Sequence, residues 1–99
     1  MRIGLEAPDG RIYSEEKPKD LLHTVSRVFQ IGFIPMKELI EAEGKEVSFS
    51  VFKKHCMNVV NTLPPKGRLS GGKLRQAIEI AWQDTKAGNN HGFEITEKN

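Results

Sequence analysis

The sequence predicts an α+β fold that is mostly helical, with about four short helices and a small β-hairpin at the N-terminus. Two patterns predict this class. Apolar and polar residues alternate over residues 1–13, as on a half-buried strand, and apolar residues recur at helical spacing over most of residues 14–87. A length of 99 residues, of which 37% are apolar, suits a single compact domain over residues 1–99 with one modest core.

The hairpin is expected over residues 1–13. Residues 3–7 alternate in polarity, and the Pro-Asp-Gly sequence at 8–10 has the composition of a tight turn, after which residues 11–13 return as the second strand. An isolated hairpin is marginally stable in water, so a third strand or a helix must support it. Residues 88–99 are expected to form a tail or an edge strand, and the alternation over residues 92–96 makes that stretch the candidate third strand.

Two helices are expected between residues 14 and 44. Ser14, followed by two glutamates, suits a helix start, and Gly32 is expected to end this first helix. Pro35 suits the first turn of a short second helix, which Gly44 is expected to stop. The expected apolar faces consist of Leu21, Leu22, Val25, Val28 and Phe29 in the first helix and Met36, Leu39 and Ile40 in the second.

Two further helices are expected after residue 47. Ser48 is predicted to cap the third, and Pro64-Pro65 to prevent it from continuing beyond residue 63. Ser70 is predicted to cap the last helix, residues 70–87. The expected apolar faces consist of Phe49, Phe52, Cys56, Val59, Val60 and Leu63 in the third helix and Leu74, Ala77, Ile78, Ala81, Trp82 and Thr85 in the last.

The charge of the chain is unevenly distributed. Residues 45–75 hold seven cations and one anion, a net charge of +6, whereas the other residues hold eight cations and twelve anions, a net charge of −4. Such a polarised chain suggests that one face binds a polyanion. The alternative is a solvated basic helix without a partner.

The basic Gly/Pro loop at residues 64–73 resembles part of a nucleotide-binding P-loop. Gly67, Gly72 and Lys73 fit the pattern, but Leu74 stands where a P-loop needs a Ser or Thr hydroxyl for Mg²⁺, so no nucleotide site is expected. A helix N-terminus in this loop would still favour an anion such as a nucleic-acid phosphate. The alternative is a plain N-cap and tight turn. The candidate anion-binding residues are Lys66, Arg68, Ser70, Gly71, Gly72, Lys73 and Arg75.

Residues 36–61 resemble a helix-turn-helix. Leu39, Ile40 and Ala42 would line the first helix, Gly44 would lie at the turn, and Val47 with Ser48 would lead into the second helix, where Val51 or Phe52 packs inward. The resemblance implies that residues 49–63 form a recognition helix in a DNA major groove. Its polar face would contact bases and phosphates through Ser50, Lys53, Lys54, Asn58 and Asn61. The same span also fits an ordinary helical corner.

The sequence carries no catalytic signature, and no enzyme activity, metal or cofactor is expected. His55 and Cys56 are adjacent, so on a helix they point about 100° apart and do not form a nucleophile–base pair. The three histidines lack metal-ligand spacing, and the single cysteine allows no intrachain disulfide. No apolar run is long enough to span a membrane, and the N-terminus has an acidic residue where a secretory signal is apolar, so a cytoplasmic location is expected.

The function expected from these features is that of a small regulatory protein that binds nucleic acid, DNA rather than RNA. The alternative is a protein-interaction module, an adaptor or inhibitor, whose basic face docks on an acidic surface of a larger, nucleic-acid-handling partner. An exposed cluster of Phe33, Ile34, Met57 and Ile80 would favour a protein partner, whereas a continuous basic strip would favour nucleic acid. A helix-turn-helix domain of this size usually works as a symmetric pair, so a homodimer is compatible with the first function.

Overall fold

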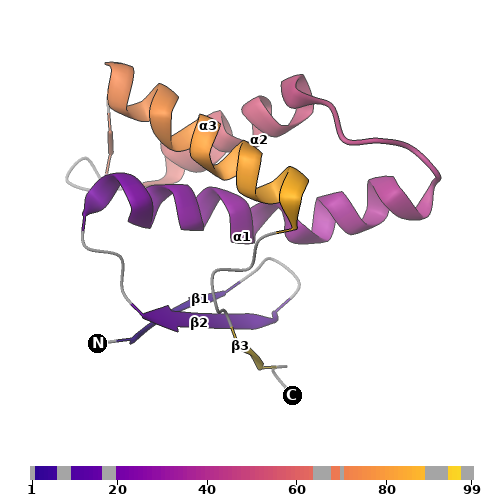
Figure 1. The fold of residues 1–99 in the computed structure, drawn as a ribbon, viewed down its shortest axis with the longest axis horizontal. Helices are drawn as coiled ribbons and strands as arrows, with labels where there is room; N and C mark the ends of the chain where they lie inside the picture. Colours follow the sequence, from indigo (N-terminus) through magenta and orange to yellow (C-terminus); the bar gives the residue numbers. More distant parts are fainter. Residues whose placement is uncertain are drawn as a thin grey trace.

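The computed structural model describes residues 2–6, 10–16, 20–63, 68–69, 71–88 and 94–96. The helices are α1 (Leu21–Ala42), α2 (Phe49–Thr62) and α3 (Gly71–Ala87). The strands are β1 (Arg2–Glu6), β2 (Ile12–Glu16) and β3 (Glu94–Thr96), paired antiparallel in the order β1-β2-β3. In Figure 1 the strands lie below α1, on the side away from α2 and α3.

The predicted fold class, a mostly helical α+β domain with about four short helices, is wrong. The part of the chain with described side chains is a small fold of three helices, and all ten buried apolar residues lie on them. The strands contribute backbone pairing, with Leu5 opposite Tyr13 and Tyr13 opposite Ile95, but no described core residue. The sequence overestimated the number of helices because it divided α1 into two.

The helix α1 begins later than predicted. Ser14 belongs to β2, where it is paired with Gly4 on one side and Glu94 on the other, so it does not start a helix. Asp20 is the N-cap instead, and its carboxylate accepts hydrogen bonds from the His23 backbone N–H at 2.8 Å and the His23 Nδ1 at 2.7 Å. These hydrogen bonds hold the pKa of Asp20 below its usual value.

The predicted break at Gly32 and the predicted second helix from Pro35 are also wrong. Both residues lie inside the 22-residue helix α1. A proline in a helix interior removes one backbone hydrogen bond and costs roughly 3 kcal/mol. Burial of Phe29, Ile31 and Phe33 in the preceding two turns offsets this cost, because each is at most 2% exposed. Tertiary packing therefore overrides two local helix breakers.

The remaining helix predictions are confirmed only in part: α2 and α3 lie where helices were predicted, but Phe49, predicted on the apolar face of α2, is 40% exposed, and Leu63 lies beyond the end of this helix. Ser48 caps α2, accepting from the Val51 backbone N–H at 3.3 Å. Along α2 the buried residues are Phe52, Cys56 and Val60, and along α3 they are Ala77, Ile78, Ala81 and Thr85. The predictions for Ser70 as a cap and for Pro64-Pro65 as a stop lie outside the described residues. Of the turn predicted at residues 8–10 only Gly10 is described, and it has a positive φ of 91°, which suits a glycine in a tight turn.

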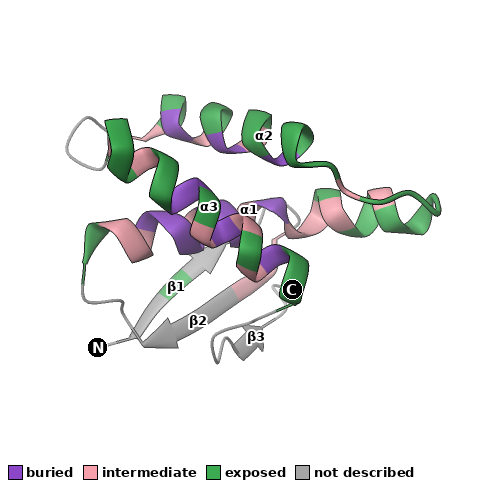
Figure 2. Cartoon of the chain, turned by 45° about the horizontal axis from the view of Figure 1, so that its top comes forward, coloured by how far each residue is buried: buried purple, intermediate pink, exposed green. Residues whose placement is uncertain are grey.

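An aromatic cluster joins the three helices at the centre of the core. The Phe33 and Phe52 rings meet edge to face at 5.0 Å between centroids, and the Phe52 and Trp82 centroids are 5.4 Å apart. In Figure 2 the residues coloured as buried lie on the parts of α1, α2 and α3 that are turned toward one another, and the outer faces of α2 and α3 are coloured as exposed. This cluster fixes how α2 and α3 lie beside each other, and it thereby positions the groove described next.

Candidate docking groove between α2 and α3

The helix α3 presents different residues to its two neighbours. The residues that project between α1 and α3 are small, namely Ala77, Ala81 and Thr85, and they allow the two helices to approach closely. The α1–α3 contact is accordingly the most extensive contact between helices, and it includes an ion pair of Arg27 with Asp84 at 3.4 Å. Bulkier residues face α2: Leu74, Ile78 and Trp82.

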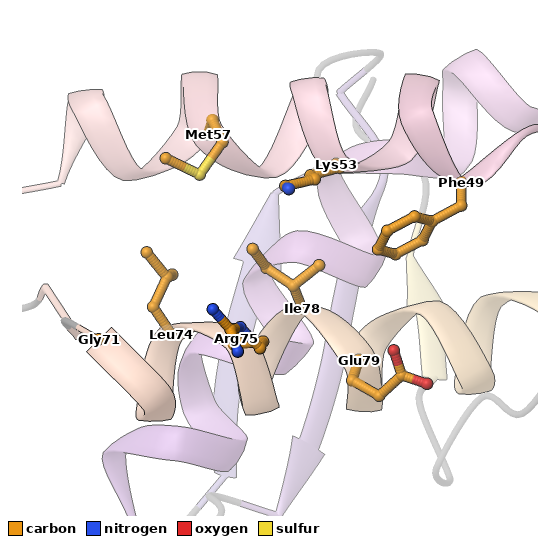
Figure 3. Close-up of a pocket in the computed structure, with 8 residues that line it drawn as sticks. All are labelled: Phe49, Lys53, Met57, Gly71, Leu74, Arg75, Ile78 and Glu79. Atoms are coloured by element: carbon orange, nitrogen blue, oxygen red, sulfur yellow. The ribbon is translucent and has the colours of Figure 1, made fainter.

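A groove of about 440 Å³ lies between α2 and α3. In Figure 3 the Met57, Lys53 and Phe49 side chains extend from α2 toward α3, and the Leu74 and Ile78 side chains extend back from α3. Most of the lining is apolar. The full lining consists of Phe49, Lys53, Met57, Gly71, Leu74, Arg75, Ile78 and Glu79.

Large apolar side chains on the α2 side of the groove remain accessible to solvent. Phe49 and Met57 are each 40% exposed, although other apolar residues of the same helix are buried in the core. Phe49 touches the Trp82 ring, with centroids 5.5 Å apart, and so closes one end of the groove. Toward Gly71 no described aromatic residue closes the groove, and Met57 lies opposite Leu74 (Figure 3).

Cations line both sides of this apolar strip. Lys53 on α2 and Arg75 on α3 line the groove (Figure 3), and Lys54 and Lys73 are exposed on the same two helices. Among the described residues, no carboxylate lies within ion-pair distance of these four side chains. The one acidic lining residue, Glu79, accepts a hydrogen bond from the Gln83 amide at 3.0 Å.

The structure brings together part of the candidate site predicted from the sequence. Lys53 and Arg75 lie in the groove together with Gly71. The remaining described candidates on the helices are exposed, on α2 or in the first turn of α3; they are Ser50, Lys54, Asn58, Asn61, Gly72 and Lys73. Lys66 and Ser70 lie outside the described residues.

Arg68 has a structural role in addition to its charge. Its Nε donates to the Leu63 carbonyl at 2.7 Å, and a terminal nitrogen donates to the Asn61 carbonyl at 3.3 Å. These are carbonyls at the end of α2 that the helix itself leaves without partners. A contact between Arg68 and a phosphate would therefore compete with the cap of α2.

The span that resembles a helix-turn-helix packs differently from the expectation. Leu39 is 68% exposed and Ala42 is exposed, so of the three residues expected to line the first helix only Ile40 packs against the core. Phe52, rather than the 39% exposed Val51, is the inward residue of the second helix. In Figures 1 and 2 α2 returns lengthwise along α1.

The groove could not be recognised as such in the sequence, although one signal was present. Val51 and Met57 lie outside the predicted apolar stripe of α2, so this helix carries more apolar surface than one buried face needs. The exposed apolar cluster that would favour a protein partner was expected from four residues. Of these, Phe33 is fully buried, Ile34 and Ile80 are partly buried, and only Met57 is exposed. The exposed apolar cluster forms around Met57 and Phe49 instead.

The chemically reactive candidates lie in the core, away from the groove. Burial raises the pKa of the Cys56 thiol to about 12, which keeps it protonated near neutral pH. His55 is half-buried between α1 and α2, with its Nε2 3.2 Å from the Phe29 carbonyl, and burial lowers its pKa. No group of three His, Cys, Asp or Glu residues suited to a metal ion occurs within the described ranges.

No known protein family, curated protein or solved structure matches this chain. Within the described residues, every helix is too short or too polar to cross a membrane. The geometry of the groove and the charges around it are therefore the basis for the functional proposal.

Proposed function

We propose that this protein is a small protein-interaction module that docks an acidic amphipathic segment of a partner protein in the groove between α2 and α3. The observation that carries this proposal is the exposure of Phe49 and Met57, each 40%, inside an apolar groove with Lys53 and Arg75 at its sides. Binding sites in proteins are typically concave and mostly apolar, with a few polar or charged groups that fix the orientation of the ligand.

The dimensions of the groove suit a short helix or an extended peptide. The lining residues on α3 run from Gly71 to Glu79, which is about 12 Å at 1.5 Å per residue. Two turns of a partner helix cover this length, and apolar residues at positions i and i+4 would insert between the Met57 and Leu74 side chains. Acidic residues of the partner on either side of that stripe would meet Lys53 and Arg75.

The charge of the groove selects the chemistry of the partner. Among the described residues, Lys53 and Arg75 form no ion pair, and the Glu79 carboxylate in the same lining accepts from Gln83 instead. A partner carboxylate would therefore gain a charge-assisted hydrogen bond without breaking an existing ion pair. The same cations would repel a basic segment. Such a module would serve as an adaptor or inhibitor for a partner that presents an acidic segment.

Binding of nucleic acid is the second candidate function. Lys53, Lys54, Lys73 and Arg75 gather on α2 and the first turns of α3, and a phosphate backbone could track along them. The polar face with Ser50, Asn58 and Asn61 would then face the bases. In that case the apolar groove would have no role, which is why the protein partner is preferred.

One pair of adjacent substitutions distinguishes the two functions. Met57→Glu and Asn58→Glu add the same charge to the same exposed turn of α2, but only residue 57 lines the groove. The probes are a fluorescent amphipathic peptide of about 14 residues built of Leu, Ala and Glu, and a mixed-sequence DNA duplex. Fluorescence anisotropy would give both affinities across a salt series.

If the groove binds the acidic segment, Met57→Glu weakens peptide binding at least about tenfold, because a charge enters an apolar contact, whereas Asn58→Glu changes it less than about threefold. If nucleic acid is the partner, both substitutions weaken duplex binding alike and the affinity falls steeply with salt. Failure of the wild-type protein to bind the peptide would refute the proposed function.

A further inference from the structure

The C-terminal end of α1 carries exposed apolar side chains of its own. We define the α1 arm as residues 36–43. Met36 is 42% exposed and Leu39 is 68% exposed, the highest value among the large apolar side chains that the structure describes. They are three residues apart and therefore lie on neighbouring parts of one helix face. In Figures 1 and 2 this end of α1 projects past the ends of α2 and α3.

The charge of the α1 arm is opposite to that of the groove. Residues 36–43 hold three glutamates and one lysine, a net charge of −2. The two groove helices and their connection, residues 47–87, hold seven cations and two anions, Glu79 and Asp84, a net charge of +5. The chain thus carries both an acidic amphipathic helix end and a basic apolar groove.

We infer that a second copy of this chain occupies the groove, by inserting its α1 arm between α2 and α3. This inference rests on the proposed function of the groove and names its partner. Leu39 and Met36 of one copy would fill the apolar strip next to Met57 and Leu74 of the other. Glu43, which lies on the same helix face as these two residues one turn further, would reach Lys53 or Arg75.

The ion pairs already present on the α1 arm do not prevent the arm from entering the groove of a second copy. Glu43 lies 3.7 Å from Lys45, and both side chains are about two-thirds exposed. Exposed pairs of this kind contribute little to stability, typically about 0–1 kcal/mol, because solvent screens them. Glu38 with Arg11 and Glu41 with Lys37 lie on other faces of the α1 arm and can stay paired.

The arm of a chain is not placed to enter the groove of the same chain. It continues the straight path of α1 beyond the other helices, while Phe49 closes the near end of the groove against Trp82 (Figures 1 and 2). The contact is therefore between different surfaces of two copies, so it can repeat to give chains or closed rings, of which the smallest is a pair that exchanges arms reciprocally. A contact of this size is small, so we expect association in the micromolar range or weaker.

Complementation between two variants tests the inference. Met57→Glu blocks the groove and leaves the arm intact, whereas Leu39→Gln removes the apolar anchor of the arm and leaves the groove intact. Both positions are exposed, so neither substitution threatens the fold. Sedimentation velocity would be measured for the wild type, for each variant alone, for their equimolar mixture and for the double variant, up to about 1 mM.

We expect the average mass of the wild type to rise with concentration and each single variant to remain monomeric. The mixture should form a dimer and nothing larger, because only one intact arm and one intact groove remain, and adding the double variant to either single variant should form none. A wild type that stays monomeric, or single variants that assemble like the wild type, would overturn the inference.

The Leu39→Gln variant also separates this inference from the proposed function. Its groove is intact, so it should bind the Leu, Ala and Glu peptide as tightly as the wild type does. Peptide binding together with a monomeric wild type would leave the function of the groove standing and refute self-association. Loss of both peptide binding and assembly in the wild type would refute both.

Discussion

The helix α3 meets α1 and α2 in different ways. Against α1 it presents Ala77, Ala81 and Thr85, all buried, and the two helices form the most extensive helix contact. Against α2 it presents Leu74 and Ile78, and a groove of about 440 Å³ remains between them. A second hollow, of about 350 Å³, lies where the end of α1 and the residues after it meet α3 near Trp82 and Thr85. Small residues let two backbones approach closely, whereas larger residues that do not interlock hold two helices apart. Stability of this fold should therefore depend on the α1 side, and binding on the α2 side.

The largest expected difference is between two phenylalanines of α2. Phe52 is fully buried and Phe49 is 40% exposed, yet both rings contact Trp82. Phe52→Ala should lower the free energy of unfolding by about 3–5 kcal/mol because it leaves a cavity in the core. Phe49→Ala should lower it by less than about 1.5 kcal/mol and should weaken peptide binding more than tenfold. Urea unfolding and anisotropy give the two values; equal losses of stability would contradict the division between core and groove.

The next largest expected difference is in the loss of stability caused by a leucine at a buried position of α3 and by a leucine in the groove. Ala81→Leu inserts three carbon atoms at a fully buried position of α3, and we expect it to lower the free energy of unfolding by about 1–3 kcal/mol. The matched control is Met57→Leu in the groove, a change of similar chemistry with room around it, which should alter stability by less than about 0.5 kcal/mol. If Ala81→Leu were tolerated as well as the control, the α1–α3 contact would not be closely packed.

A smaller effect concerns the contact between α1 and α2, where His55 is held near the Phe29 carbonyl. Burial lowers the pKa of His55 below 6.5, so the folded state binds fewer protons than the unfolded state between the two pKa values. Stability contributed by neutral His55 is therefore complete above about 6.5 and is lost as the pH falls toward the lowered pKa.

His55→Gln provides the test, since the Gln amide can still donate to the Phe29 carbonyl but does not titrate. The free energy of unfolding, measured by urea titration from pH 7.5 to pH 5.5, should fall for the wild type and stay flatter for the variant. Parallel curves for the two proteins would show that protonation of His55 does not oppose folding.

The smallest expected effect is a gain of stability at Gly32. This residue lies inside α1, and a Cβ there would come 3.4 Å from the His55 Cε1 and Nε2 atoms, which is ordinary contact distance. Gly32→Ala should therefore raise the free energy of unfolding by about 0.5–1 kcal/mol through helix propensity alone. Thermal unfolding would detect this gain; a loss of stability would show that His55 needs the space that the glycine leaves.

Local chemistry explains which parts of the fold were predictable. The cap at Ser48 and the burial of Phe52, Cys56 and Val60 follow from hydrogen bonding and helical spacing within a few residues, and the structure has them where the sequence predicts. Phe49 was predicted on the same face of α2 but is 40% exposed. The errors at Ser14, Gly32 and Pro35 have a different origin. Ser14 is paired with a neighbouring strand instead of starting a helix. The burial of Ile31 and Phe33, on either side of Gly32, stabilises α1 as one continuous helix through Gly32 and Pro35.

The candidate site, like the fold, could be predicted only in part from the sequence. The cations Lys53 and Arg75 could be chosen from the sequence because charge is a property of each residue, and the uneven distribution of charge is visible in the chain. That these cations flank an apolar groove could not be predicted. It depends on how far apart α2 and α3 lie, and the aromatic cluster around Phe52 and Trp82 sets that distance.

The sequence by itself determined where charge gathers, where α2 begins and which faces of α2 and α3 enter the core, because each of these depends on neighbours along the chain. The tertiary structure alone decided that α1 is one helix, that its end projects with Leu39 exposed, and that α2 and α3 leave a groove. These features follow from the packing of residues that are distant in sequence. The energy of that packing exceeds the local preference of any single residue.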